Sequence, residues 1–127
     1  MQEIIAHLSK FDKERNWNDY EKVKTREEKI DLLYKQIVHT IGELGEFANL
    51  VKKCKRDNEW HIEQLKEEIT DTFIFLLKIS MTLDMDLKEE FFKIAKVRQG
   101  KHQLLNINLN LYSSQKDLKE WKKGHKV

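Results

Sequence analysis

Residues 25–55, TREEKIDLLYKQIVHTIGELGEFANLVKKCK, decide the fold of this protein. The stretch opens on Thr25 with Glu28 three residues later, the capping-box pattern that marks the start of a helix. Apolar residues then recur every three or four positions, which places them on one face of a helix. This stripe consists of Ile30, Leu33, Tyr34, Ile37, Ile41, Leu44, Ala48 and Val51. The pattern predicts one long helix over residues 25–55.

The same periodicity predicts three further helices, over residues 2–14, 59–83 and 87–101. We expect the helix over 59–83 to run back along the long helix so that their apolar stripes share one core. The alternation of apolar residues with Asn in LLNINLNLY predicts a short strand or extended arm near residues 104–112. The expected fold is therefore all-α and four-helix-bundle-like, with this arm near its C-terminal end.

The ends of the two long helices carry a further expectation. Asp57 and Asn58 follow the first long helix, and either side chain is of a type that caps a helix N-terminus. We expect one of them to cap the helix over 59–83. The segment before Thr25 breaks the helical periodicity and predicts an irregular connection.

Composition excludes several classes of protein. A chain of 127 residues has the size of one domain, and its net charge of +2 disfavours a dedicated nucleic-acid binder or a membrane-surface protein. No apolar run reaches transmembrane length, and the N-terminus is too polar for a signal peptide. The single cysteine, Cys54, fits a reducing compartment. We therefore expect a cytoplasmic protein with no membrane partner.

Residues 72–79, TFIFLLKI, are apolar almost all the way round the helix. A helix of this kind is buried on more than one side. One core in a chain of this length rarely encloses a helix so fully. The segment therefore predicts a homo-oligomer.

Two acidic pairs interrupt the apolar helices. Glu43 and Glu46 lie three residues apart, and Glu68 and Asp71 repeat this spacing on the next helix. Residues at i and i+3 are neighbours on a helix surface, so antiparallel helices bring both pairs to one pocket. Clustered carboxylates raise one another's pKa, and a hard divalent cation such as Mg²⁺ relieves the repulsion. Such a site suits phosphoanhydride hydrolysis, in which a carboxylate takes a proton from the attacking water.

Other interpretations of these residues stay open. In a chain with 36% charged residues, each acidic pair taken alone is explained as a solvated helix face. The pairs also suit a non-catalytic helical binding or assembly module with a structural or regulatory metal site. A di-iron site is disfavoured because no His follows a Glu by three residues. A nucleic-acid accessory role has KKCKR (52–56) and a short basic cluster around Trp121 in its favour, but the small net charge makes it the weakest interpretation.

The acidic pairs resemble the ExxE…ExxD pattern of the all-α nucleoside triphosphate pyrophosphatases, the MazG-like group that includes dCTP pyrophosphatases and dimeric dUTPases. ELGE (43–46) and EITD (68–71) match the two halves of that pattern. FDKERNW (11–17) is similar to the N-terminal segment of the dCTP branch, and MDLKEEFFKIAKVRQGKH (85–102) resembles the third core helix. The resemblance covers about residues 11–102 of the single domain and leaves residues 103–127 as a C-terminal extension.

This resemblance implies cleavage of a (d)NTP between its α and β phosphates with Mg²⁺ as cofactor, or Mn²⁺ as an alternative. The products are a (d)NMP and pyrophosphate, which suits a role in sanitising the nucleotide pool. Glu43, Glu46, Glu68 and Asp71 would be the catalytic metal ligands, with one glutamate as the base for the water. Members of the family usually form homodimers or homotetramers.

The resemblance also implies substrate-binding residues. Trp17 and Phe75 would lie against the base. Lys93, Lys96 and Arg98 would reach the phosphates, although a solvated basic helix end explains them about equally well. His39, one turn before Glu43, is expected to be an ordinary surface histidine, with a phosphate or base contact as the alternative.

Overall fold

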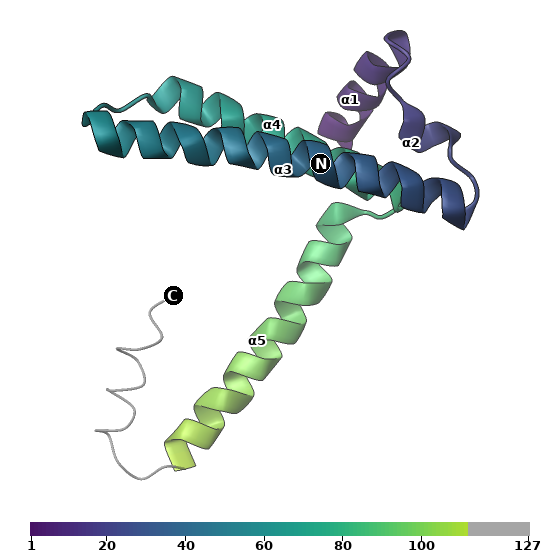
Figure 1. The fold of residues 1–127 in the computed structure, drawn as a ribbon. Helices are drawn as coiled ribbons and strands as arrows, with labels where there is room; N and C mark the ends of the chain where they lie inside the picture. The colour runs from purple at the N-terminus through teal and green to yellow at the C-terminus, as the bar shows by residue number, and fades with distance from the viewer. Residues whose placement is uncertain (112–127) are drawn as a thin grey trace. The chain divides into compact units, whose positions relative to one another are not determined.

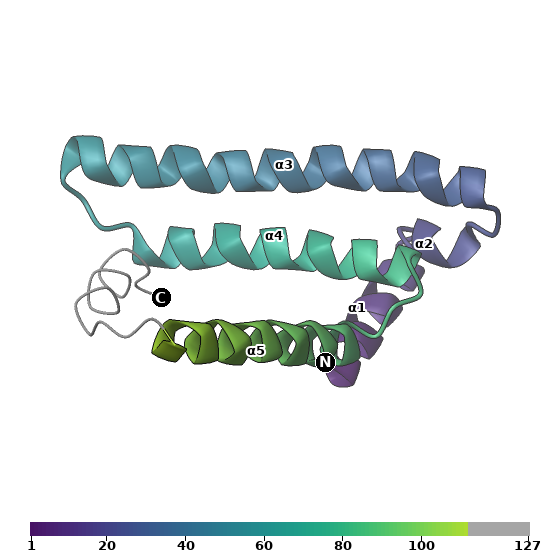
Figure 2. The same ribbon diagram turned by 90° about the horizontal axis from the view of Figure 1, so that it is seen from below.

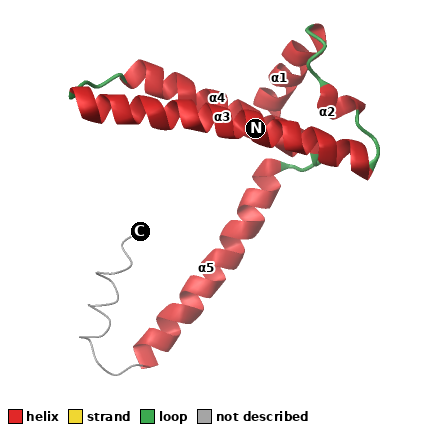
Figure 3. Cartoon of the chain, viewed as in Figure 1, coloured by secondary structure: helices red, strands yellow, loops and turns green. Residues whose placement is uncertain are grey.

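The computed structural model describes the backbone of residues 1–111 and the side chains of residues 1–101. In this part of the chain all regular structure is helical (Figures 1 and 3), which confirms the all-α prediction. The helices are α1 (Gln2–Glu14), α2 (Asp19–Lys22), α3 (Arg26–Asp57), α4 (Ile62–Thr82) and α5 (Leu87–Leu111). The chain forms two compact units, Met1–Leu87 and Lys88–Val127. None of the described helices is both long and apolar enough to cross a membrane.

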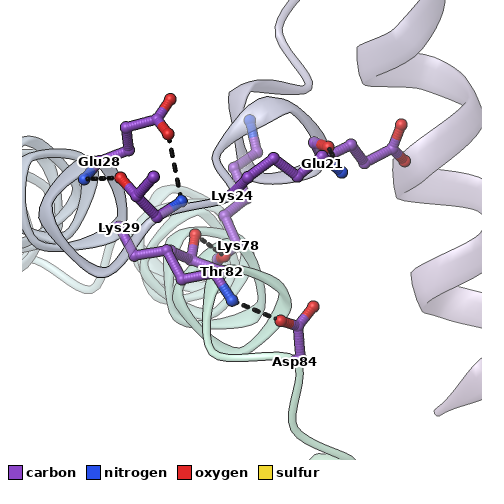
Figure 4. A network of polar contacts seen from close by, with 8 residues as sticks. Glu21, Lys24, Glu28, Lys29, Lys78, Thr82 and Asp84 are labelled. Atoms are coloured by element: carbon purple, nitrogen blue, oxygen red, sulfur yellow. Dashed lines mark hydrogen bonds and ion pairs between the residues drawn. The ribbon is translucent and has the colours of Figure 1, made fainter.

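The predicted start of the long helix is confirmed atom by atom. The Thr25 hydroxyl accepts a hydrogen bond from the Glu28 backbone N–H, and the Glu28 carboxylate accepts one from the Thr25 N–H, each at 3.1 Å. This capping box (Figure 4) satisfies two backbone donors that the first helical turn leaves unpaired. α1 also has its predicted bounds. The connection between α1 and α3 was expected to be irregular, but it contains the single turn α2.

The predicted cap of α4 is wrong. Asn58 instead ends α3 in the left-handed conformation, with φ 51° and ψ 43°, and its N–H donates to the Cys54 carbonyl. Asn tolerates this conformation better than most residues, and this geometry is a common way for a helix to stop. α4 begins at Ile62, four residues later, with His61 as its N-cap and without a side-chain capping bond.

α3 and α4 are antiparallel neighbours and lie side by side in both Figure 1 and Figure 2. Their contact face is partly polar. The Gln36 side-chain amide donates to the Thr82 hydroxyl at 2.8 Å, and both residues are buried. Farther toward the turn, Leu65 and Cys54 are buried on the two helices. Polar and apolar residues of this face together hold the hairpin.

The expectation that the two apolar stripes share one core holds only in part within unit Met1–Leu87. On α4, Leu65 and Thr72 of the predicted stripe are buried, and Ile62 and Ile79 are half-buried. Most of the other stripe residues are exposed: Ile30, Tyr34, Ile37, Ile41, Leu44 and Val51 on α3 and Ile69, Leu76 and Leu83 on α4. The hairpin closes partly through polar groups, since Gln36 and Thr82 bond to each other across it, whereas the Thr72 hydroxyl donates to the Glu68 carbonyl of its own helix.

α1 and α2 dock on the C-terminal half of α4 through a buried polar cluster. The Tyr20 hydroxyl donates to the Asp12 carboxylate at 2.8 Å, and Lys78 Nζ lies 3.3 Å from the other Asp12 oxygen. Burial and the hydrogen bond to Asp12 raise the pKa of the Tyr20 hydroxyl. Figure 4 shows the neighbouring ion pair between Lys29 and Asp84, which ties the start of α3 to the end of α4 at 2.7 Å. These contacts fix the end of the hairpin that lies opposite its turn.

The predicted extended arm near 104–112 is wrong over residues 104–111, because they continue α5 as helix. Adding residues to an existing helix costs less than starting a new element, and an isolated strand has no ladder to stabilise it. The chain holds no Pro to stop α5. Residues 112–127 of the predicted C-terminal extension lie outside the described residues.

Candidate metal centre

Three carboxylates meet between α3 and α4. One oxygen each of Glu43, Glu68 and Asp71 lies within 4.8 Å of the others, and all three residues are half-buried. The antiparallel hairpin brings them together because Glu43 on α3 lies opposite the turn of α4 that carries Asp71. Glu46 is exposed and does not belong to this group of three. Its charge nevertheless acts on both Glu43 and Glu68.

Burial and the neighbouring carboxylates raise the pKa of Glu43 and of Glu68. Burial is the first cause of the raised pKa of Glu43, followed by the charges of Glu46 and Asp71. Burial is again the first cause for Glu68, and the charge of Glu46 is the second. His39 works in the opposite direction and lowers the pKa of Glu43. The cluster therefore carries more negative charge than its surroundings neutralise.

The chemistry of these groups fits a hard divalent cation. Oxygen Oε2 of Glu68 is buried and has no hydrogen-bond partner among the described side chains. A buried carboxylate oxygen without a donor is costly unless a cation or a proton compensates it. All the donor atoms are carboxylate oxygens, the ligands that Mg²⁺ prefers. Glu43, Glu68 and Asp71 are thus the residues that would hold it.

An aromatic pair adjoins the carboxylates on the side away from the hairpin turn. The rings of His39 on α3 and Phe75 on α4 stack with centroids 5.5 Å apart and planes inclined by 5°. Lys78 Nζ lies 5.6 Å from the centroid of Phe75. The sequence singled out His39 and Phe75 separately but did not predict that they meet.

The other predicted substrate residues lie elsewhere. Trp17 follows α1, is 57% exposed, and packs on Phe11 with ring centroids 6.1 Å apart. Lys93, Lys96 and Arg98 belong to α5 and therefore to the second unit. Their contact with a nucleotide stays a prediction.

A polar pocket adjoins the carboxylates on the side toward the hairpin turn. Its volume is about 370 Å³. The residues that line it are Glu46, Asn49, Leu50, Lys53, Gln64, Glu67 and Glu68. Asn49 and Lys53 were missed by the sequence analysis. They lie three and seven residues after Glu46, which is the spacing that would have placed them on its face of the helix.

The raised pKa values predict how the stability of the metal-free protein depends on pH. A carboxyl with a raised folded-state pKa stabilises the fold fully below its unfolded pKa, and this contribution is lost as pH rises through the folded pKa. The pH range over which this contribution is lost begins near pH 4.5, the ordinary pKa of a glutamate, and extends upward. We expect Glu68→Gln, which cannot ionise, to melt at a higher temperature than wild type at about pH 7 without divalent cations.

The difference in melting temperature between Glu68→Gln and wild type should shrink as the pH falls toward about 4, where Glu68 itself becomes neutral. Thermal unfolding of both proteins across that pH range, in the presence of a chelator, measures it. Glu63→Gln, at an exposed position of α4, is the matched control and should leave the pH dependence unchanged. A variant that is less stable than wild type at neutral pH contradicts the expectation.

Comparison with known proteins adds no relative: no protein-family model matches the chain, and no similar curated protein or solved structure is found. The resemblance to the all-α pyrophosphatases therefore rests on the acidic motifs and their neighbours in the sequence. What the protein does must be argued from the carboxylate geometry.

Proposed function

We propose that the protein is a nucleoside triphosphate pyrophosphohydrolase that cleaves a (d)NTP between its α and β phosphates with Mg²⁺, giving a (d)NMP and pyrophosphate. The observation that carries this proposal is the meeting of Glu43, Glu68 and Asp71 within 4.8 Å across two helices. Together with the ExxE…ExxD spacing in the sequence, this meeting of carboxylates supports a cation site that binds phosphate groups. A role in clearing unwanted nucleotides from the pool follows from that activity.

The carboxylates divide into two tasks in this proposal. Glu43, Glu68 and Asp71 hold Mg²⁺, or Mn²⁺ in its place, and the bound cation supplies charge neutralisation at the phosphates. Glu46 lies beside this group without belonging to it and is exposed to water. One of the carboxylates serves as the base for the attacking water, and the stacked His39 and Phe75 form the wall nearest the nucleoside.

The test is pyrophosphate release from a panel of NTPs and dNTPs, with Mg²⁺, with Mn²⁺ and with a chelator. Cation-dependent release from at least one nucleotide, together with the monophosphate as second product, supports the proposal. Release of single phosphates would indicate a different bond and overturn it. No turnover, with Mg²⁺ raising the melting temperature, would instead favour a non-catalytic binding or assembly module that holds a metal.

We also propose that a second copy of this chain covers the exposed apolar stripes, giving a homodimer or a homotetramer. The α3 residues 30, 37, 44 and 51 repeat every seven positions, as do 69, 76 and 83 on α4. Such spacing is typical of helix seams that pack against other helices. Burying one Leu or Ile side chain stabilises by about 1.5–3 kcal/mol, so a seam of this length supports a stable four-helix arrangement of two hairpins.

A charge placed in the seam should break the oligomer. Ile41 is 64% exposed in the single chain, so Ile41→Glu should change the stability of one hairpin little. Between two hairpins of an oligomer the same change buries a carboxylate, which is costly. We expect sedimentation velocity to show monomers for Ile41→Glu and oligomers for wild type at the same concentration. Lys35→Glu, an exposed change of charge on the same helix, is the control and should stay oligomeric. A wild-type chain that sediments as a monomer contradicts the proposal.

A further inference from the structure

The polar pocket beside the carboxylates gives the substrate a direction. It shares Glu68 with the group of three carboxylates, is also lined by Glu46, and extends from there toward the turn between α3 and α4. The aromatic pair of His39 and Phe75 lies on the other side of the cluster. The carboxylates therefore separate two chemically different ends of one site.

The end toward the turn is lined by hydrogen-bond donors. The amides of Asn49 and Gln64 and the ammonium of Lys53 line the pocket, and Leu50 is its one apolar residue. Within residues 1–101 the side chains of Asn49, Lys53 and Gln64 make no hydrogen bond or ion pair with other side chains or backbone, so their donors are free to bind a ligand.

The lining distinguishes the two ends of a nucleotide. A nucleobase binds to flat apolar or aromatic surfaces, which this pocket lacks and the His39–Phe75 pair supplies. A phosphate chain binds to ammonium and amide donors, and it needs a cation beside it here because Glu46, Glu67 and Glu68 outnumber Lys53. The cluster of Glu43, Glu68 and Asp71 is placed to hold that cation.

We propose, on the basis of the pyrophosphohydrolase function above, that the pocket lined by Asn49, Lys53 and Gln64 binds the β and γ phosphates and then the pyrophosphate product. The nucleoside lies toward His39 and Phe75, and the α phosphate lies at the carboxylates. Lys53 is a substrate-binding residue that selects the triphosphate over the monophosphate.

The reaction balances in this orientation. The water oxygen bonds to the α phosphorus while the bond from that phosphorus to the α–β bridging oxygen breaks. The bridging oxygen leaves with the β phosphate as pyrophosphate, and one proton of the water passes to a carboxylate on the side of the α phosphorus opposite the leaving group. The positive charge of Lys53 favours the negative charge that develops on the leaving group.

The experiment measures binding of the two products separately. Isothermal titration with Mg²⁺ present follows inorganic pyrophosphate in one series and dCMP in the other, for wild type, Lys53→Gln and Phe75→Leu. A hydrogen bond to a charged group has the strength to change affinity by about 10- to 100-fold. We expect Lys53→Gln to weaken pyrophosphate binding by that factor and to change dCMP binding by less than about twofold.

Phe75→Leu should do the reverse, weakening dCMP and sparing pyrophosphate. Lys52→Gln removes the same charge from the adjacent position, outside the pocket lining, and should affect neither ligand. Far-ultraviolet circular dichroism and melting temperature show whether each variant is folded. A Lys53→Gln protein that is folded and binds pyrophosphate as wild type does, or that loses both ligands equally, overturns the inference.

Failure of this inference is distinguishable from failure of the proposed function. If Lys53→Gln keeps both its cation-dependent turnover and its affinity for pyrophosphate, the proposed substrate orientation is wrong but the proposed enzymatic function stands. If the protein hydrolyses no nucleotide but binds pyrophosphate in a way that depends on Lys53, the phosphate-binding pocket is supported and the proposed reaction is wrong.

Discussion

Asp71→Asn is expected to lower kcat/KM for the best nucleotide by about 10²-fold or more, the largest loss of activity that follows from the proposed function. The change keeps the size of the side chain and removes one of the three carboxylates that meet within 4.8 Å. An amide oxygen is a weaker ligand for a hard cation than a carboxylate. Pyrophosphate release measured over a range of Mg²⁺ concentrations should therefore show both a lower rate and a higher Mg²⁺ requirement.

The melting temperature of Asp71→Asn shows whether a loss of activity comes from the carboxylate site or from unfolding. The charge of Asp71 is one cause of the raised pKa of Glu43, so removing it relieves repulsion in the metal-free protein. Asp71→Asn should then melt at the same temperature as wild type or higher in chelator, and gain less on addition of Mg²⁺. Asp31→Asn, an exposed position on α3, is the control and should keep full activity. Full activity in Asp71→Asn would contradict the metal centre itself.

Lys78→Met is expected to lower the free energy of unfolding by about 3–5 kcal/mol, the largest loss of stability that the structure predicts. Asp12 is 1% exposed, and the Lys78 ammonium is 3.3 Å from its carboxylate. Removing the lysine leaves a buried carboxylate whose one remaining side-chain partner among residues 1–101 is the Tyr20 hydroxyl. Urea denaturation at neutral pH measures the loss.

A second change tests the cause of this loss. Asp12→Asn added to Lys78→Met removes the unpaired charge, so the double variant should be more stable than Lys78→Met alone. Lys66→Met is the matched control, because its ion pair with Glu63 is exposed and worth less than about 1 kcal/mol. A Lys78→Met protein that loses no more than this control would show that the buried pair does not hold α1 and α2 to α4.

The parts of the fold that sequence could predict are those set by local spacing. Thr25 and Glu28 predicted the start of α3 because a capping box involves only neighbours in the chain. The i and i+3 spacing of the acidic residues predicted which carboxylates share a helix face. Their meeting across the hairpin then needed α3 and α4 to run antiparallel in the right register, and in that register Glu46 stays outside the group of three.

The parts that sequence could not predict depend on which faces meet. Gln36 and Thr82 are polar, so their positions did not suggest the buried contact of α3 with α4. The pairing of His39 with Phe75 depends on the register of the hairpin, which Asn58 helps to set by ending α3 in a left-handed turn. The strand predicted near residue 104 failed because a period of two in a short segment does not outweigh continuation of an existing helix.

The acidic centre is confined to a single hairpin, from Glu43 on α3 to Asp71 on α4. Contacts that are local in sequence form early in folding, because closing a short loop costs little chain entropy. During synthesis the residues of this hairpin emerge from the ribosome before those of α5. If the proposed cation site and homo-oligomer both form, we expect cation binding to a single hairpin to precede assembly, because the site needs only one chain and the covered seam needs two.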